Sequence, residues 1–558
     1  MGSILIDSRN RILPCLIFLA LSIFAFFLTF KAGERGFFAF DQSIVFDGGY
    51  RILSGQIPYK DFIMPVGPVA FWIQAAFFKV MGVSYFSYIF TSASINALSA
   101  ICSICIIRML FPSHRLLSYA GGILTAVWFS PPFGTLWVDQ ASFFFSFLAI
   151  AILLFSQLSR KKYPVANGLL LSVSGSFALL SILCKQNAGL YILPLYFLLL
   201  AASRRPDSKS FLYSWCIFLS GFIVSLLIFI LWLWIKSDLK IFLQYFIYIP
   251  SLLGIDRILE AKADFLRTFL GGSSKYAHLY LLSSGIRIIF ASVFITAAFA
   301  LSVSIRNHKR AGYPARRELL ASILCLYVLL FQYLFIHTTM NQAENGIPFI
   351  GIILAVGAAL LLYLYKSSPL EIRFAYCKII PVAALSLLVA YVSMLGIDVS
   401  LNRKVHQLSD SKFPGYLALD KLRALKWALP TMVGGADVKE DDIVSIFKYL
   451  KTKNNNFFVF PNFTFLYAIL GTPSPQPILW FHKGLTYHVI YDQALDKRVV
   501  DDLNKNMVKV IIIEDKPDYN HYVLNDFPQL MSYIRNNFVK IKQQGIFNIY
   551  EKKDPRVL

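Results

Sequence analysis

The sequence has few charged residues for its length. Charged side chains make up 15% of the 558 residues, whereas they make up about 25% of a typical soluble domain. Hydrophobic residues make up 57%, and the mean hydropathy is +0.60. Apolar runs of about 18 residues or more recur along the chain, and such runs are typical of membrane-spanning helices. The shortage of charge excludes an ordinary soluble protein and predicts a multi-pass α-helical membrane protein.

Cysteine is also scarce, and its placement excludes a disulfide framework in the last part of the chain. All seven cysteines lie in or beside predicted membrane spans, and none follows residue 377. Cys102 and Cys105 share one helix face, but no further cysteine or histidine lies near them, so we expect them to pack rather than to bind a metal. The P-loop, GxSxG and HExxH motifs are absent, and we find no internal repeat of the kind that transporters carry.

Acidic residues are outnumbered by basic ones, 31 to 53, and the distribution of the excess indicates topology rather than nucleic-acid binding. The predicted spans are residues 12–30, 85–109, 116–131, 141–158, 165–184, 189–203, 211–235, 280–304, 318–337, 347–365 and 379–397. With these eleven spans and a cytoplasmic N-terminus, every cluster of Lys and Arg between spans falls on the cytoplasmic side, as the positive-inside rule requires.

This topology depends on residues 66–82, which we expect to lie in the plane of the membrane. The segment contains Pro68, Gln74 and Lys79. If it crossed the membrane, every later loop would change sides and the basic clusters would lie outside. An in-plane helix at the interface avoids that conflict. The outer side then receives residues 31–84, about 132–140, 185–188, 236–279 and 338–346, and everything after residue 398.

The tail predicts a separate α/β domain on the outer face, residues 399–558, after a membrane domain of residues 1–398. Its charge is mixed, and short period-two apolar runs predict strands at 457–461, 508–514 and 545–552. Helical patterns are expected near 440–452, 463–470, 496–506 and 526–538.

One stretch of the first outer loop, FDQSIVFDGGYRILSGQIPYKDF at 40–62, places three carboxylates close to lipid. The apolar spacing after Asp41 predicts a short amphipathic helix that ends near Gly55 and Pro58. In a purely structural interpretation, Asp41 caps the helix, Asp47 is solvated and Asp61 lies in a turn. A functional interpretation stays open beside it, because carboxylates near lipid are costly.

The pattern from Asp41 to Pro68, D-x(13)-G-Q-I-P-Y-K-D-F-x-x-P-x-G-P, resembles the first outer loop of GT-C type, polyprenyl-phosphate-dependent glycosyltransferases. These include protein mannosyltransferases and the lipid A aminoarabinose transferase. The resemblance implies transfer of a sugar, a hexose or a pentose, from a polyprenyl-phosphate donor to a hydroxyl of a lipid, glycan or protein acceptor. It extends to the plan of the whole chain, most weakly after residue 400.

The resemblance places a catalytic base at Asp41, with Asp47 in reserve. A carboxylate within reach of a hydroxyl can remove its proton as the new bond forms, and direct displacement with one carboxylate inverts the anomeric carbon. Many relatives have Asp-Glu here, whereas Gln42 follows Asp41 in this chain, which weakens a metal-ligand version of the mechanism; a divalent cation stays open and no cofactor is assigned. Met64 stands where some relatives have a basic residue, which makes Lys60 a candidate for the donor phosphate.

Two helix ends carry further candidates. Asp139, in SPPFGTLWVDQ, opens a span at its outer end, where a carboxylate also suits the helix dipole. Lys185, in LCKQNAGLY, lies at the outer end of another span, where snorkelling is the alternative explanation. The family often has an Asp and a Lys at corresponding places. The resemblance therefore implies that Asp139 orients the acceptor or a lysine and that Lys185 binds the donor phosphate.

A polar loop at 337–349, HTTMNQAENGIPF, adds His337 and Glu344 as candidates for sugar or acceptor contact, against the alternative of an ordinary polar turn. The aromatic stretch within 236–279 predicts another in-plane helix. Expected partners are membrane lipids, the lipid-linked donor and an acceptor, with no nucleic acid, and the expected location is a bacterial inner membrane. Two other functions stay open: a transporter or flippase of a lipid-linked glycan, and a non-catalytic envelope assembly factor.

Overall fold

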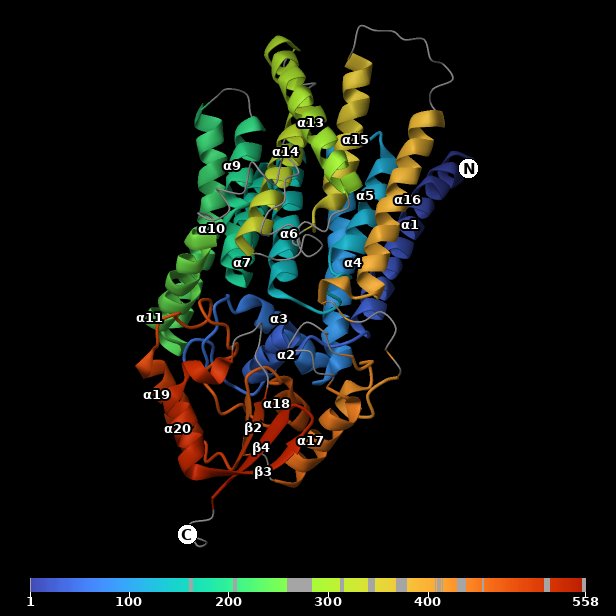
Figure 1. Cartoon of the computed structure of the whole chain (residues 1–558). Helices are drawn as coiled ribbons and strands as arrows, with labels where there is room; N and C mark the ends of the chain where they lie inside the picture. Colours follow the sequence, from blue (N-terminus) through green and yellow to red (C-terminus); the bar gives the residue numbers. More distant parts are fainter. Residues whose placement is uncertain are drawn as a thin grey trace.

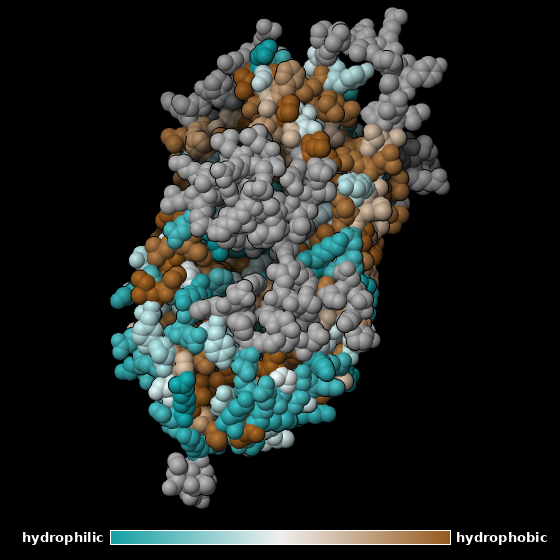
Figure 2. Space-filling model, viewed as in Figure 1, coloured by the Kyte–Doolittle hydropathy of each residue, from teal (hydrophilic) through white to brown (hydrophobic). Residues whose placement is uncertain are grey.

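The computed structural model is a bundle of helices with a small α/β domain at one end (Figure 1). It describes residues 2–159, 164–203, 208–257, 284–311, 316–339, 347–367, 379–406, 408, 413, 415–428, 438–453, 456–515 and 522–553. The N-terminus lies at the end of the bundle away from the α/β domain. Brown apolar side chains cover much of the bundle and teal polar ones most of the α/β domain on the face in Figure 2. The fold is therefore that of a multi-pass membrane protein with a C-terminal α/β domain, as predicted.

The bundle consists of long helices and three shorter ones. The long helices are α1 (Gly2–Gly33), α4 (Tyr85–Leu110), α6 (Val138–Ser159), α7 (Pro164–Cys184), α10 (Ser208–Lys236), α13 (Ser284–Ala311), α14 (Arg316–Thr339), α15 (Ile350–Ser367) and α16 (Ile379–Leu401). The shorter helices are α5 (Arg115–Trp128), α8 (Gln186–Leu190) and α9 (Leu193–Ala202). Within the described ranges, ten helical segments are long and apolar enough to cross a membrane.

Nine of the eleven predicted spans coincide with these ten segments. The predicted spans 116–131 and 189–203 are wrong in length, because α5 and α9 have 14 and 10 residues. Pro131 and Pro132 follow the end of α5, and Pro194 lies in the first turn of α9. Proline cannot continue a helix beyond its first turn, so these prolines account for the short lengths of α5 and α9. The tenth segment, Leu239–Arg257, was expected to lie in plane.

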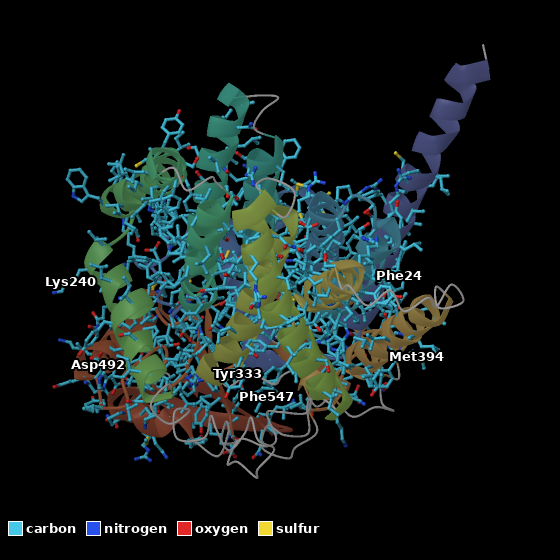
Figure 3. All side chains as sticks on the ribbon, turned by 90° about the horizontal axis from the view of Figure 1, so that it is seen from above. Phe24, Lys240, Tyr333, Met394, Asp492 and Phe547 are labelled. Carbon is cyan, nitrogen blue, oxygen red and sulfur yellow. The ribbon has the colours of Figure 1, made fainter. Side chains whose placement is uncertain are left out.

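Three helices lie between the bundle and the α/β domain. In Figure 1, α2 (Ala39–Leu53) and α3 (Val69–Met81) occupy this layer. The 13 residues of α3 reach about 20 Å at 1.5 Å per residue, too short for a hydrocarbon core of about 30 Å. The third runs from α11 (Leu239–Phe242) through a π-helical turn (Leu243–Tyr248) to Arg257. Figure 3 looks down the bundle and shows the helix that begins near Lys240 lengthwise. The structure thus has helices at both segments that the sequence predicted to lie in plane, of which α3 is too short to span and 239–257 has 19 residues.

The α/β domain contains one four-stranded sheet in the order β1-β2-β4-β3. Strands β1 and β2 are parallel, and the other two pairs are antiparallel. The elements are β1 (Phe457–Phe460), β2 (Val510–Glu514), β3 (Phe538–Gln544), β4 (Phe547–Lys552), α17 (Glu440–Thr452), α18 (Phe465–Leu470), α19 (Gln493–Lys505) and α20 (Pro528–Asn537). All predicted strands and helices of the domain are present. The sequence missed β3, because most side chains of this edge strand are exposed and give no buried face to recognise.

The first loop is hydrogen-bonded to the tail at two places. The Gly36 amide donates to the Lys426 carbonyl at 2.9 Å, and the Phe37 amide to the Ala428 carbonyl at 2.8 Å. Further along, the Ile63 amide donates to the Pro477 carbonyl at 2.7 Å. These backbone bonds fix the loop between the bundle and the α/β domain.

A buried ion pair joins α2 to the same domain. The Arg51 Nε atom lies 2.8 Å from Asp47 Oδ2, and both side chains are fully buried. Arg51 also donates to the Gln476 carbonyl at 2.8 Å and to the Ser474 hydroxyl. Removing one partner of a buried pair leaves an uncompensated charge, which is costly.

We therefore expect Arg51→Met to destabilise the protein by about 3–5 kcal/mol, the usual cost of breaking a buried pair. Thermal unfolding in detergent micelles measures this. Lys404→Met is the matched control, because the Lys404–Asp398 pair is exposed and such pairs contribute about 1 kcal/mol or less. Equal melting temperatures for the two variants would contradict the role given to Arg51.

Candidate active site

The predicted polar residues gather at the domain end of the bundle. Asp41 lies in the first turn of α2, Asp139 in the first turn of α6, and Lys185 directly follows α7. The positive end of a helix dipole favours a carboxylate in a first turn. The helices thus bring these side chains to the end of the membrane domain that faces the α/β domain.

Asp139 and Lys185 form an ion pair, which identifies Lys185 as a lysine that Asp139 can orient, one of the two roles expected for Asp139. Lys185 Nζ lies 2.5 Å from Asp139 Oδ1, and the two side chains are 17% and 1% exposed. Lys185 Nζ also lies 5.6 Å from the centre of the Phe335 ring on α14, close enough for a cation–π interaction. The ammonium group is held by one carboxylate and one ring face but stays partly open, so a ligand can reach it.

The Asp41 side chain is partly exposed, and the side chain of its neighbour Gln42 is buried. Helix α2 begins at Ala39 and its cap is Phe38, so the structural interpretation of Asp41 as the cap is wrong. Gln42 Oε1 accepts from the Phe38 amide at 2.6 Å, and Gln42 Nε2 donates to Thr135 Oγ1 at 2.9 Å. A carboxylate could not donate to Thr135 in this way, which accounts for glutamine at position 42. This contact joins the start of α2 to the loop that leads to Asp139.

Asp47 has a different environment from Asp41. It is fully buried, and burial raises its pKa to about 6, although the neighbouring Arg51 acts in the opposite direction. The interpretation of Asp47 as a solvated residue is therefore wrong. Its contact with Arg51 gives it a structural role in joining α2 to the tail.

The turn that carries Lys60 contacts the α/β domain. Lys60 is exposed, and its carbonyl accepts from Arg498 of α19 at 2.8 Å. Asp61 accepts from the Ile57 amide at 2.7 Å, which confirms the predicted turn. The contacts of Lys60 are thus with α19, whereas those of Lys185 are with α6 and α14.

The loop after α14 is described only in part. Glu344 lies outside the described residues, and so does the side chain of His337, whose backbone belongs to α14. At the end of this helix, the carbonyls of Thr338 and Thr339 accept from Arg257 Nη1, each at 3.1 Å. Sequence reasoning missed Arg257, although a basic residue on the side with few of them is a usable signal.

The α/β domain contributes an aromatic cluster to the same region. Trp480 lies 5.5 Å from Phe40 and 5.8 Å from Trp137 between ring centres, edge to face in both cases. Phe40 directly precedes Asp41, and Trp137 comes two residues before Asp139. Trp480 Nε1 is buried without a hydrogen-bond partner. No sequence motif marks Trp480, and more than 300 residues separate it from Phe40 and from Trp137.

His482 completes this cluster, 5.7 Å from the Phe40 ring. Burial lowers its pKa to about 4, and the charge of Arg257 acts in the same direction. His482 is therefore neutral at pH 7. Its neutral ring and the two cations Lys185 and Arg257 make the region suited to an anionic ligand, beside carboxylates able to accept a proton. Among the described residues, no three His, Cys, Asp or Glu side chains converge as metal ligands.

Comparison with known proteins gives structural neighbours but no sequence family. No family model and no curated protein matches the sequence. ArnT from Cupriavidus metallidurans bound to undecaprenyl phosphate is 12% identical, with 97% of this chain and 98% of that chain covered and a TM-score of 0.46. The apo oligosaccharyltransferase of Archaeoglobus fulgidus is 10% identical, with 89% and 69% covered and a TM-score of 0.49.

Both neighbours are GT-C glycosyltransferases, the class that the first loop resembles. A second structure of the Cupriavidus metallidurans protein, in the apo state, gives a TM-score of 0.49 at 12% identity, with 96% of this chain and 97% of that chain covered. These identities and TM-scores are low, so the likeness alone assigns no family and no activity to the chain.

The depressed pKa of His482 predicts a pH-dependent stability. In the unfolded chain a histidine titrates near 6.5, so protonation favours unfolding, and stability is lost as pH falls from 6.5 towards 4. At pH 5 the loss is about 2 kcal/mol. His482→Asn should therefore show a flatter melting temperature between pH 7 and pH 5 than the native protein. Parallel curves for the two proteins would contradict the burial of a neutral His482.

Proposed function

We propose that the chain is a glycosyltransferase that moves a sugar from a polyprenyl-phosphate donor to an acceptor hydroxyl at the outer face of the membrane. The observation that carries the proposal is the meeting of the Asp41 turn, the Asp139–Lys185 pair and the α/β domain at one end of the bundle. A lipid-linked donor needs this arrangement, because its chain lies in the bilayer while its phosphate lies at the level of the helix ends.

Lys185 is our choice for the donor phosphate. A lysine is a compact charge suited to a phosphate, and the ion pair with the Asp139 carboxylate holds its ammonium group in place. As the donor binds, the phosphate becomes a second anionic partner of the ammonium group. When the bond between the anomeric carbon and the phosphate oxygen breaks, this cation stabilises the charge that develops on the leaving group.

Asp41 is our choice for the general base. Its partly exposed carboxylate accepts the proton of the acceptor hydroxyl as that oxygen forms a bond to the anomeric carbon, and the lipid phosphate leaves with the electron pair of the broken bond. Direct displacement inverts the anomeric carbon. Asp47, the reserve candidate, is fully buried and paired with Arg51, which favours Asp41.

The orientation follows from charge. The C-terminal ends of α4, α13 and α15 and the starts of α5 and α14 lie at the end of the bundle that carries the N-terminus (Figure 1), and they carry basic residues such as Arg108, Arg115, Arg306, Arg316 and Lys366. Basic residues between spans stay in the cytoplasm. The α/β domain and the site then lie outside the cytoplasm, in the proposal at a bacterial inner membrane. The acceptor is a lipid, a glycan or a protein with an accessible hydroxyl.

Asp41→Asn should lower transfer by about 100-fold to 10,000-fold, the range of general-base contributions, with donor binding retained. The transfer rate is measured with a radiolabelled polyprenyl-phosphate sugar and the purified protein. Donor binding is measured by the thermal stabilisation that the donor gives. Asp61→Asn, a change in the same loop at an exposed carboxylate, is the matched control. Native turnover by the Asp41→Asn variant would refute the assignment.

Lys185→Met should weaken donor binding by about 10-fold to 100-fold, as expected for the loss of a charge-assisted hydrogen bond. The readout is the concentration of polyprenyl phosphate that gives half-maximal thermal stabilisation. Lys60→Met removes an exposed cation from a turn whose backbone is bonded to Arg498 of α19, so we expect a smaller effect at Lys60. A larger effect at Lys60 would exchange the two assignments.

A further inference from the structure

The α/β domain exposes three consecutive apolar residues on a loop. Val489, Ile490 and Tyr491 are 64%, 73% and 48% exposed, just before α19. In a domain surrounded by water, such a run on a loop exposes apolar area without a structural reason. The neighbours of this loop therefore indicate which kind of partner covers its apolar side chains.

One neighbour of the loop is the helix 239–257, most of whose side chains are apolar. Phe242 packs against Tyr59 at 5.0 Å and Phe229 at 5.3 Å between ring centres. On another side, Tyr245 and Ile249 belong to the buried cluster of the α/β domain. The exposed side carries, together with the exposed Ser251, five large apolar residues: Leu243, Ile247, Tyr248, Leu252 and Ile255. Exposed apolar side chains that gather on one face mark an interaction site, and this face lacks a partner within the described residues.

The exposed face of this helix and the loop lie next to each other. A Cβ atom added to Gly484 would lie 3.4 Å from Val489 and 4.0 Å from Leu253 of the helix. Asp492, at the end of the loop, interacts electrostatically with Tyr245 of the same helix. Figure 3 shows Lys240 and Asp492 at the same edge of the molecule. The loop and the helix therefore present one joint surface.

This surface continues the lipid-facing belt of the bundle. Trp234 and Ile235, on the last turn of α10, are exposed large apolar side chains. Helix 239–257 begins three residues later, after its cap Asp238. In Figure 2, brown side chains reach the level at the left edge where Figure 1 places α11. The joint surface thus adjoins the exposed apolar side chains at the domain end of α10.

We propose that this surface docks into the headgroup–acyl boundary of the bilayer and tethers the α/β domain to the membrane. The docking surface consists of Leu243, Ile247, Tyr248, Leu252, Ile255, Val489, Ile490 and Tyr491. Tyrosines are enriched at this depth, and interfacial helices bury an apolar face there. Lipid is the occupant, rather than a protein, because the docking surface is continuous with the belt that lipid already covers.

The tether has a consequence for the candidate site, which rests on the proposed function. The segment that ends at Tyr491 begins at Trp480 and His482, which contact Phe40 at the start of α2. Docking of the loop therefore holds these two aromatic residues against the Asp41 turn.

Photocrosslinking of the full-length protein in nanodiscs of phosphatidylcholine and phosphatidylglycerol tests the docking without requiring activity. Benzoylphenylalanine replaces Ile490, and mass spectrometry measures the lipid adducts. Val539 on β3 is the matched control, because it is exposed at 49% on the same domain but β3 lies at the end away from the bundle (Figure 1). Leu231, exposed on α10, is the reference for lipid contact.

The expected result is an adduct yield at position 490 close to that at position 231 and about tenfold above that at position 539, as for an interfacial side chain. A yield at position 490 equal to that at position 539 would overturn the proposal, and so would crosslinks to a second protein copy in place of lipid. Since the readout is independent of catalysis, its failure would leave the glycosyltransferase assignment standing, and loss of that assignment would leave the docking intact.

Discussion

The ion pair between Asp139 and Lys185 is the interaction on which the candidate site depends. Lipid tails offer no partner to a charge, so an ammonium group at the end of a membrane helix must be paired or reach water. The pairing distance of 2.5 Å and the partial exposure of Lys185 satisfy both needs. The pair also fixes α6 against α7, so the helix that carries Asp139 and the loop before it have a defined place relative to the Asp41 turn.

The α/β domain completes this site from a distant part of the sequence. Backbone bonds at Gly36 and Ile63 and the buried Asp47–Arg51 pair hold the first loop against the tail. Trp480 and His482 then pack on residues next to Asp41 and Asp139. A carboxylate and a cation at a helix end are common, and what distinguishes this end of the bundle is the aromatic cluster of Phe40, Trp137 and Trp480 beside them.

The sequence predicted the architecture well because it depends on local patterns. Apolar length and the positive-inside rule identified most spans, and period-two runs identified three strands of the sheet. The errors arise where local patterns conflict with tertiary context: prolines shortened α5 and α9, and the exposed edge strand β3 has no buried face. Asp139 and Lys185 were each named, and orienting a lysine was one of the two roles expected for Asp139. The contribution of Trp480 could not be predicted, because it requires the packing of segments far apart in the chain.

The central claim is that a sugar is transferred from a polyprenyl phosphate outside the cytoplasm. Mass spectrometry of the lipid-linked sugars and envelope glycans of a strain that lacks the protein tests it most directly. The account predicts the loss of a single-sugar decoration together with accumulation of its polyprenyl-phosphate donor on the outer face. An unchanged decoration, or a donor retained on the cytoplasmic face, would contradict it.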